Sequence, residues 1–273
     1  MTGPIFDTHA HYSSRAFDAD RFALLDSLPA KGVVGVCEQA THSGDAPRVL
    51  ELAHRYPWVV AAIGIHPESL LPAADCGEDG PAPTVSVYGG DWAAEMRALM
   101  PYYDDPKVVA VGECGLDYHW PVPKDAQLAL FEAEIRLALE LDKPIIVHDR
   151  SAHADVYALL KKYRPKGIVH CYSGSAEDAV QLAAQGLYIG FGGACTFNGA
   201  KRAAKAIEAL PLDAIVLETD CPYMAPEPVR GTRCDSSLIR YVGEYIASIK
   251  GEEPEQVFRQ TVENACQVYN LSV

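Results

Sequence analysis

Two histidines separated by a single alanine stand near the start of the chain, His9 and His11 in the stretch FDTHAH. If this stretch is a β-strand, residues two apart point to the same side, so both imidazoles face one way together with Asp7. Neutral imidazole is a common ligand of divalent metals, and two such neighbours can reach one ion. The motif also arises by chance, so by itself it leaves a metal site and an incidental pair both open.

Further residues of the ligand types stand at or just after the ends of other apolar runs. Glu113 lies in VVAVGECGLDY, His148 in PIIVHDR, His170 in GIVHCYSG and Asp220 in AIVLETDCPY. Each of these residues alone has a plain structural explanation, such as a satisfied hydrogen bond or a helix cap. Their recurrence after separate apolar runs is explained far better by a shared metal site than by chance.

The elements that must position these side chains can be read from the hydrophobic pattern. Between two of the apolar runs, Leu128, Phe131, Ile135 and Leu139 recur at three- and four-residue spacing, as on a helix that covers a sheet. Ser175, three residues before Asp178, predicts the start of another helix, which Gly186 ends. Short apolar or β-branched runs predict eight strands, near residues 4–9, 32–37, 59–64, 108–113, 144–148, 167–170, 187–191 and 214–218.

Strands that alternate with helices pair in parallel, and eight repeats indicate a closed barrel. We therefore predict an α/β fold of the TIM (β/α)8 barrel type, as a single domain over residues 1–273. An open doubly wound sheet is the competing fold, but the sequence lacks the GxGxxG loop that would favour it. In a barrel the strand ends that carry the candidate ligands share one rim. The Pro- and Gly-rich segment 70–90 is either an acidic lid over that rim or a passive surface insertion.

The number of candidate ligands exceeds what one catalytic ion needs. A catalytic zinc uses three protein ligands and a water, so six candidates indicate two divalent ions. Zinc, manganese, magnesium and nickel all accept histidine with carboxylate, so the metal stays open. We expect Glu113 to bridge the two ions. The six residues are divided as His9, His11 and Asp220 on one ion and His148 with His170 on the other, around Glu113.

The composition narrows the class of protein. Against 37 acidic side chains stand 23 basic ones, a formal net charge of −14 that disfavours a surface coating duplex nucleic acid. The N-terminus lacks the pattern of a secretion signal, and no run approaches the roughly 20 apolar residues that span a bilayer. The eight cysteines form no close CxxC pair and indicate reduced thiols. We expect a cytoplasmic protein without membrane contact.

The ordered motifs of the chain resemble those of one enzyme family. FDTHAH, GIHP, VGECGLDY, PIIVHDR, GIVHCYSGS, YIGFGGACTF, LETDCPYMAPEPVRGTR and the NA of VENACQVYN are similar to the motifs of the TatD-like metal-dependent deoxyribonucleases, within the amidohydrolase-type barrels. The resemblance spans nearly the whole chain and implies a TIM barrel, a divalent-metal centre and hydrolysis of DNA phosphodiester bonds, typically from the 3′ end. The family's ligands fall on the six residues already named.

The chain departs from the family pattern on the substrate side. Glu68 follows GIHP where the family commonly has another histidine, and the segment 234–236, Cys-Asp-Ser, replaces the usual Asn-Glu-Pro. His66 could donate to a substrate phosphate or be a core histidine bonded to the backbone. Arg230 and Arg233 could fork onto a phosphate or pair with neighbouring acids, and we favour the phosphate.

These observations together predict a hydrolase that cleaves phosphodiester bonds by metal-activated water. Asp220 is expected to accept the proton of that water, and Glu113 to act with it as the second catalytic carboxylate. The expected substrates are DNA ends or short single-stranded oligonucleotides, and no obligate protein partner is inferred. The first alternative is a hydrolase of a small phosphoester, lactone or amide on the same metals. A metal-binding scaffold or a non-catalytic nucleic-acid module is disfavoured, since no ligand is lost and no basic stripe is present.

Overall fold

The computed structural model describes residues 3–71 and 88–271. It divides into two compact units, which are considered separately below. The terminal unit comprises residues 1–38 and 168–273, and the central unit comprises residues 39–167. The prediction of a single domain over the whole chain stays a prediction. Most of the segment 70–90, proposed above as a lid or an insertion, lies outside the described residues.

The terminal unit contains the strands at both ends of the chain. Strand β1 (Ile5–Ala10) pairs in parallel with β2 (Val33–Ala40), and β7 (Leu187–Phe191) pairs in parallel with β8 (Ile215–Leu217). The chain beyond β8 joins β1, because the amide of Asp220 donates to the carbonyl of His9 at 2.9 Å and Ala10 bridges Cys221. An open sheet would leave its first and last strands apart, so this junction supports closure.

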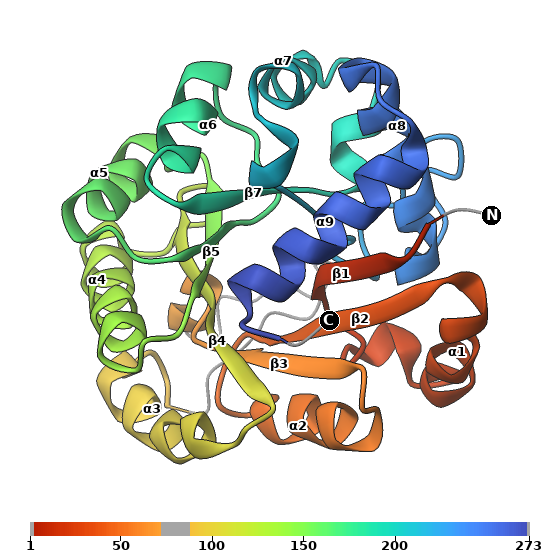
Figure 1. The fold of residues 1–273 in the computed structure, drawn as a ribbon. Helices are drawn as coiled ribbons and strands as arrows, with labels where there is room; N and C mark the ends of the chain where they lie inside the picture. The colour runs from red at the N-terminus through yellow and green to blue at the C-terminus, as the bar shows by residue number, and fades with distance from the viewer. Residues whose placement is uncertain (1–2, 72–87, 272–273) are drawn as a thin grey trace. The chain divides into compact units, whose positions relative to one another are not determined.

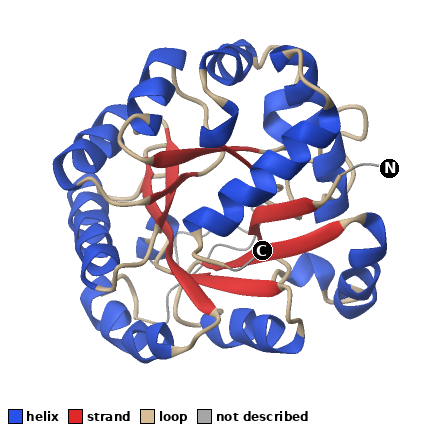
Figure 2. Ribbon diagram, viewed as in Figure 1, coloured by secondary structure: helices blue, strands red, loops and turns tan. Residues whose placement is uncertain are grey.

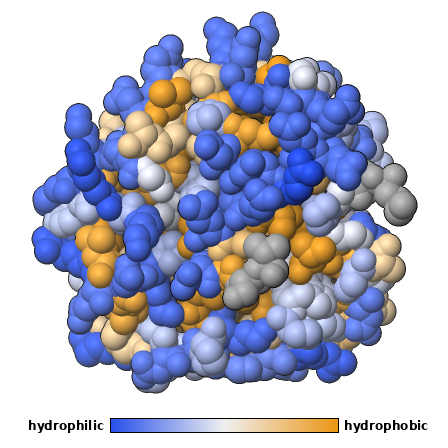
Figure 3. Space-filling model, viewed as in Figure 1, coloured by the Kyte–Doolittle hydropathy of each residue, from blue (hydrophilic) through white to orange (hydrophobic). Residues whose placement is uncertain are grey.

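The terminal unit also carries the last helices of the chain. Helix α9 (Pro254–Val268) packs on β1 and β8, and the amide of Asn264 donates to the carbonyls of Leu212 and Ile215 at 2.9 and 2.7 Å (Figure 1). Its outer side is hydrophilic (Figure 3), as expected for a helix with exposed Glu255 and Glu263 and a buried apolar face. The other helices of this unit are α1 (Arg21–Ser27), α6 (Ala176–Ala183), α7 (Lys201–Ala209) and α8 (Ile239–Lys250).

The predicted cap of α6 is confirmed. The hydroxyl of Ser175 accepts from the amide of Asp178 at 3.0 Å, which satisfies one of the unpaired donors of the first turn. Gly186 has φ of 93° just before β7 begins, a left-handed conformation that glycine adopts without strain. Strand β6 (Gly167–Val169) precedes this helix and starts at the last residue of the central unit.

The central unit is built from three parallel strands in chain order with helices after them. Strand β3 (Val59–Ile63) pairs with β4 (Val108–Asp117), which pairs with β5 (Ile145–Arg150). Helix α2 (Ala46–Arg55) packs on β3 and α4 (Lys124–Glu140) on β4, on the outer side of the strands in Figure 2. The remaining helices are α3 (Trp92–Leu99) and α5 (His153–Tyr163).

Helix α4 buries a different face from the one its apolar spacing predicts. Phe131 and Ile135 are buried as expected, but Leu139 is 46% exposed. The buried face instead includes two polar residues, Gln127 and Glu134. Gln127 hydrogen-bonds both backbone groups of Asp117, and Glu134 accepts from the amide of Ile65 at 2.8 Å. The prediction for Leu139 was wrong because strand ends, whose backbone groups need partners, selected polar side chains for this face.

In the described part of the chain, eight parallel strands, each followed by at least one helix, confirm the predicted TIM (β/α)8 barrel fold class. Strand boundaries shift by a few residues, and the largest change is in β4, which continues to Asp117. Glu113 therefore lies within a strand and not at its end. Among residues 3–71 and 88–271, no helix is both long enough and apolar enough to cross a membrane.

Seven of the eight cysteines lie in the described part of the chain, and all seven are free thiols. Cys114 and Cys221 are fully buried beside predicted ligands and act as small packing residues. Cys171 has different surroundings. It lies beyond the end of β6 with φ of 45°, is only half-buried, and its sulfur lies 4.0 Å from that of Met224.

Candidate functional site

The terminal unit gathers His9, His11 and Asp220 into one cluster, called here the terminal group. The Nε2 atoms of the two histidines lie 3.1 Å apart. The Oδ1 atom of Asp220 lies 3.7 Å from Nε2 of His9 and 3.3 Å from Nε2 of His11. A nitrogen binds zinc at about 2.1 Å, so two ligand atoms of one ion stand no more than about 4.2 Å apart. The three atoms converge as the ligands of a single ion do.

Backbone geometry holds the terminal group together. His9 lies in β1, His11 follows the end of that strand, and Asp220 follows β8 in a left-handed conformation with φ of 60°. Non-glycine residues in this conformation are uncommon, and aspartate is among those that tolerate it best. The backbone hydrogen bonds from Asp220 to His9 and from His11 to Cys221 join the two segments. They fix the three side chains relative to one another.

Asp7 hydrogen-bonds the two backbone segments that carry His9 and Asp220. Its carboxylate accepts from the amides of His9 and Thr219 at 3.2 and 3.0 Å, and from the hydroxyls of Thr219 and Ser236 at 2.6 and 2.7 Å. Burial raises its pKa to about 7 against the opposing effect of these hydrogen bonds. These contacts indicate that Asp7 supports the backbone that carries His9 and Asp220.

His170 joins the terminal group through ring stacking. Its imidazole lies 3.6 Å from that of His9, centroid to centroid, with 16° between the planes. On its other side, Nδ1 lies 3.2 Å from Oε1 of Glu218, a buried carboxylate that also accepts from the amide of Cys171 at 2.6 Å. A carboxylate behind an imidazole fixes its tautomer and directs the other nitrogen to a metal. A Cβ on Gly190 would collide with the Glu218 carboxylate, which explains the glycine in YIGFGG.

The electrostatics of the terminal group favour a charged Asp220. Burial acts to raise its pKa, but the hydrogen bond from His11 and the charges of His170 and His9 hold the pKa below its usual range. The carboxylate is therefore ionised at neutral pH, the form in which it binds a cation or accepts a proton.

The central unit forms a second cluster, the central group, from His66, Glu113 and His148. Nδ1 of His148 lies 2.9 Å from Oε1 of Glu113, and Nε2 of His66 lies 3.7 Å from the same oxygen. Glu113 lies in β4, His148 in β5, and His66 just beyond β3. A Cβ on Gly115 would collide with the carbonyl of His148, so this glycine permits the close approach of β4 and β5 beside the group.

A second carboxylate, Asp117, faces the other nitrogen of His148 at 3.2 Å. Burial lowers the pKa of His148, but the hydrogen bonds and charges of Asp117 and Glu113 overcome it and raise the pKa to about 10. The imidazole is thus protonated between two carboxylates when no metal is present. A divalent cation would supply the same positive charge, so the surroundings of His148 fit a metal ligand.

The hydrogen bonds of His66 assign it a donor role. Its Nδ1 accepts from the amide of Glu68 at 3.2 Å, so in the neutral ring the proton resides on Nε2. That Nε2 atom faces Glu113. In this tautomer Nε2 would donate a hydrogen bond, whereas metal binding through Nε2 would require the other tautomer. Contact between His66 and a substrate phosphate stays a prediction.

The two arginines predicted to bind substrate have different surroundings. Arg233 forks onto Asp20 with distances of 2.8 and 2.6 Å and also donates to the carbonyl of Ala16. Arg230 has an exposed guanidinium, and its Nη1 atom lies 3.8 Å from Oε1 of Glu227, which is longer than a hydrogen bond. Phosphate binding by either arginine stays a prediction, and Arg230 is the one whose donors are less engaged.

Asp117 and Glu218 are the site residues that the sequence analysis missed. Both stand close to predicted ligands, Asp117 four residues after Glu113 and Glu218 two residues before Asp220. Residues four apart in a strand share a face, so this rule applied to Glu113 in β4 would have found Asp117. Glu218 and Asp220 lie beyond the end of β8, so strand periodicity does not relate them. Asp117 contacts His148, and Glu218 contacts His170.

Comparison with known proteins identifies the family of the chain. The family described as TatD related DNase matches residues 6–270. An uncharacterized metal-dependent hydrolase, YabD of Bacillus subtilis, is 36% identical over 98% of this chain and all of its own length. The 3′-5′ ssDNA/RNA exonuclease TatD of Erwinia billingiae is 29% identical over 98% of this chain and 99% of its own.

Solved structures show the same fold. The TatD homologue YJJV of Escherichia coli superposes with a TM-score of 0.85, at 28% identity and 98% coverage of both chains. A TatD family hydrolase of Entamoeba histolytica gives a TM-score of 0.81 at 20% identity over the full length of both. The family match, the fold and the histidine–carboxylate groups lead to one conclusion: the chain belongs to the TatD related DNases and is a metal-dependent hydrolase.

Proposed function

We propose that this enzyme is a 3′-5′ exonuclease acting on single-stranded or short DNA. The observation that carries the proposal is the pair of histidine–carboxylate groups, each with geometry suited to a divalent ion, formed by residues of the family motifs. The relative from Erwinia billingiae that matches nearly the whole chain is named as an exonuclease of single-stranded DNA and RNA.

Each group is proposed to serve one of two divalent ions. The terminal group offers two imidazoles and a carboxylate, and the central group offers Glu113 with His148. The assignment of His170 to the second ion stays a prediction. Both are donor sets that zinc, manganese and nickel accept, and magnesium is admitted by the carboxylates. Because a (β/α)8 barrel presents all its strand ends at one face, we assign both ions to one reaction, with Glu113 as their shared carboxylate.

The bound ions would activate a water for attack on phosphorus and neutralise the charge that develops on the phosphate oxygens. Asp220 accepts the remaining proton of the attacking water, a role open to it because its lowered pKa keeps it ionised. His66 donates from Nε2 to a non-bridging phosphate oxygen. Asp7 and Glu218 hold His9, His170 and Asp220 in place and exchange no proton with substrate.

The substrate is proposed to be a strand end because the chain offers few cationic contacts. The net charge of −14 repels a long polyanion. Few neutralised phosphates release few counterions, so affinity should fall gently with salt, with a logarithmic slope nearer about −1 or −2 than the roughly −10 of a strongly basic binder. A duplex end would first have to fray, at a cost of a few kcal/mol per base.

The test compares cleavage of 3′-end-labelled single strands, blunt duplex and covalently closed circles by metal-reconstituted enzyme across a salt series. Release of 3′-terminal nucleotides from single strands with a shallow salt slope is expected. Efficient cutting of closed circles, or a steep slope, would show that the enzyme binds internal duplex and would overturn the preference for ends.

A second candidate activity, hydrolysis of a small neutral ester, lactone or amide, is favoured by one observation. Glu68 stands where the family commonly has histidine, and its amide donates to Nδ1 of His66 in the central group. An acid in place of an imidazole removes a potential cationic contact to an anionic phosphodiester. Turnover of neutral esters at rates that exceed those on oligonucleotides would select this candidate.

A further inference from the structure

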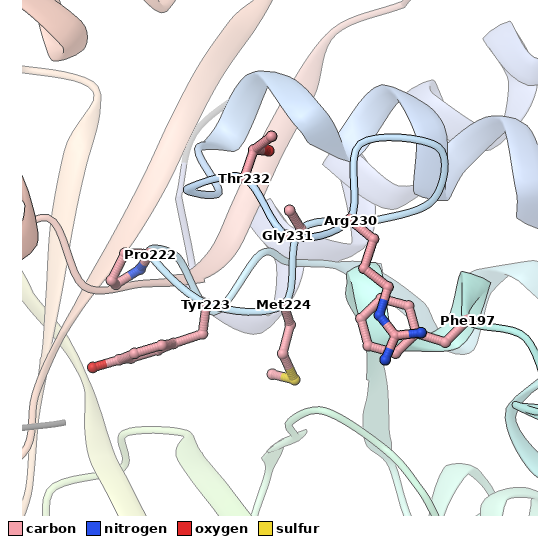
Figure 4. A pocket seen from close by; sticks show the side chains of 8 residues that line it. Phe197, Pro222, Tyr223, Met224, Arg230, Gly231 and Thr232 are labelled. Atoms are coloured by element: carbon pink, nitrogen blue, oxygen red, sulfur yellow. The ribbon is translucent and has the colours of Figure 1, made fainter. Parts of the chain in front are cut away.

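A pocket of about 310 Å³ opens next to the terminal group, within the same unit. Its lining begins at Pro222, two residues after Asp220 of the terminal group. The amide of Tyr223 in the lining donates to the carbonyl of Asp220 at 3.0 Å. Its volume is at the lower end of the roughly 300–1,000 Å³ typical of small-molecule sites. Figure 4 shows the lining side chains, which belong to Phe197, Pro222, Tyr223, Met224, Ala225, Arg230, Gly231 and Thr232.

One wall of the pocket is a stacked pair. The guanidinium of Arg230 lies over the ring of Phe197, with its carbon 4.1 Å from the ring centroid (Figure 4). Glu227, three residues earlier, lies 3.8 Å from Nη1 of Arg230. The ring and the carboxylate together limit the orientations of the guanidinium plane. Arg230 is exposed and Phe197 is half-buried, so the pair is reachable from solvent.

Apart from Arg230, Gly231 and Thr232, the lining is apolar or aromatic. Met224 and Tyr223 come from the segment that leads from Asp220 to Arg230, and Tyr223 is 46% exposed. Among the lining residues, Arg230 alone carries a charge. A site for a bare phosphate would be expected to present several donors, whereas a flat guanidinium beside apolar walls suits a flat, weakly polar ring.

We propose that this pocket binds the nucleobase of the nucleotide next to the cleaved bond, by stacking on the Arg230–Phe197 pair. Unpaired bases stack on aromatic rings and on arginine guanidinium planes, largely independently of sequence. The inference rests on the proposed nuclease function, and it explains how a strongly acidic protein holds a strand end with few phosphate contacts. Arg230 then contacts a base with the flat face of its guanidinium, and the N–H groups at the edge of the guanidinium do not bind a phosphate.

The test separates stacking from charge. Cleavage is measured on an oligonucleotide with a normal 3′-terminal nucleotide and on the same oligonucleotide with an abasic 3′ residue, and the two kcat/KM values are expressed as a ratio. We expect Arg230→Lys, which keeps the charge and loses the plane, and Phe197→Leu, which loses the supporting ring, each to lower this ratio about tenfold. Phe197→Tyr should retain it.

The matched controls lie on α8, where the guanidinium of Arg240 stacks over Tyr241 at 4.6 Å outside the pocket lining. Arg240→Lys and Tyr241→Leu should leave the ratio unchanged. If Arg230→Lys and Phe197→Leu also leave it unchanged while Arg230→Gln flattens the salt dependence on both substrates, Arg230 binds a phosphate and the base site is refuted.

A binding measurement distinguishes failure of the pocket from failure of the nuclease proposal. Saturation-transfer NMR with adenosine 5′-monophosphate and ribose 5-phosphate is performed on wild type and Phe197→Leu. Base-dependent binding that Phe197→Leu abolishes supports the pocket even if no oligonucleotide is cleaved. Cleavage of oligonucleotides with equal binding of the two probes would retain the nuclease and reject the pocket.

Discussion

The terminal and central groups each bring histidine nitrogens and a carboxylate oxygen close together, but their composition differs. The terminal group is rich in imidazole, with His9, His11 and the stacked His170 around one carboxylate. The central group is rich in carboxylate, with Glu113 and Asp117 on the two sides of His148. In the first, imidazoles keep a carboxylate ionised, and in the second, carboxylates keep an imidazole protonated. We propose that this difference divides the work, with Asp220 of the terminal group as the base and the central group as a holder of a cation.

The largest effect is expected from the terminal group. Asp220→Asn should reduce kcat on single-stranded DNA by about 10²–10⁴-fold, because an amide cannot accept the proton of the attacking water. Folding should be preserved, which thermal unfolding of the same preparation would check. Near wild-type turnover by a metal-loaded Asp220→Asn enzyme would remove Asp220 from the base role and erase the distinction between the groups.

The second effect concerns metal content. Glu113→Gln is expected to lower the occupancy of both ions, because an amide oxygen is a weaker ligand than a carboxylate and Glu113 is proposed to be shared. Elemental analysis of dialysed protein measures ions per chain for wild type and variant. Loss of a single ion would confine Glu113 to the central group and disprove the bridge.

A third, smaller effect tests the carboxylates behind the histidines. Glu218→Gln, behind His170, and Asp117→Asn, behind His148, should each weaken metal affinity about 10–100-fold. Titration of stripped protein with a metal and a competing chelator resolves the two sites. If Asp117→Asn weakens binding no more than a surface substitution such as Asp142→Asn, then Asp117 is not part of the central group's support.

The smallest effect concerns stability at a buried support of the central unit. Burial, with a contribution from Glu95, raises the pKa of Glu134 well above 4.5, so the folded state keeps a proton that the unfolded state releases. Wild-type stability should therefore fall as pH rises above about 4.5. Glu134→Gln keeps the acceptor for the amide of Ile65 and removes this fall, while Glu134→Ala should cost about 1–3 kcal/mol by leaving that amide unpaired. Denaturant unfolding of the three proteins from pH 4.5 to 8 measures the pH dependence of stability and the loss in Glu134→Ala. Parallel pH profiles for wild type and Glu134→Gln would contradict the raised pKa of Glu134.

The sequence by itself determined the repeated pattern and the principal chemistry of the protein. Strand-length apolar runs and their alternation with helices follow from local periodicity, so the (β/α)8 class was predictable. The clustering of His9, His11 and Asp220 was predictable because a barrel concentrates functional side chains at strand ends. The clustering of Glu113 with His148 followed from the same rule.

Tertiary structure decided which polar side chains pair with the strand backbones and with the two arginines. Gln127 and Glu134 occupy the buried face of α4 because strand backbones need hydrogen-bond partners, a demand that no helical periodicity records. Arg233 bonds Asp20 and Arg230 stacks on Phe197 across long separations in sequence, so their different surroundings could not be read from their shared motif. Local pattern specifies where an element runs, but the partner of a polar side chain depends on which distant segment folding brings beside it.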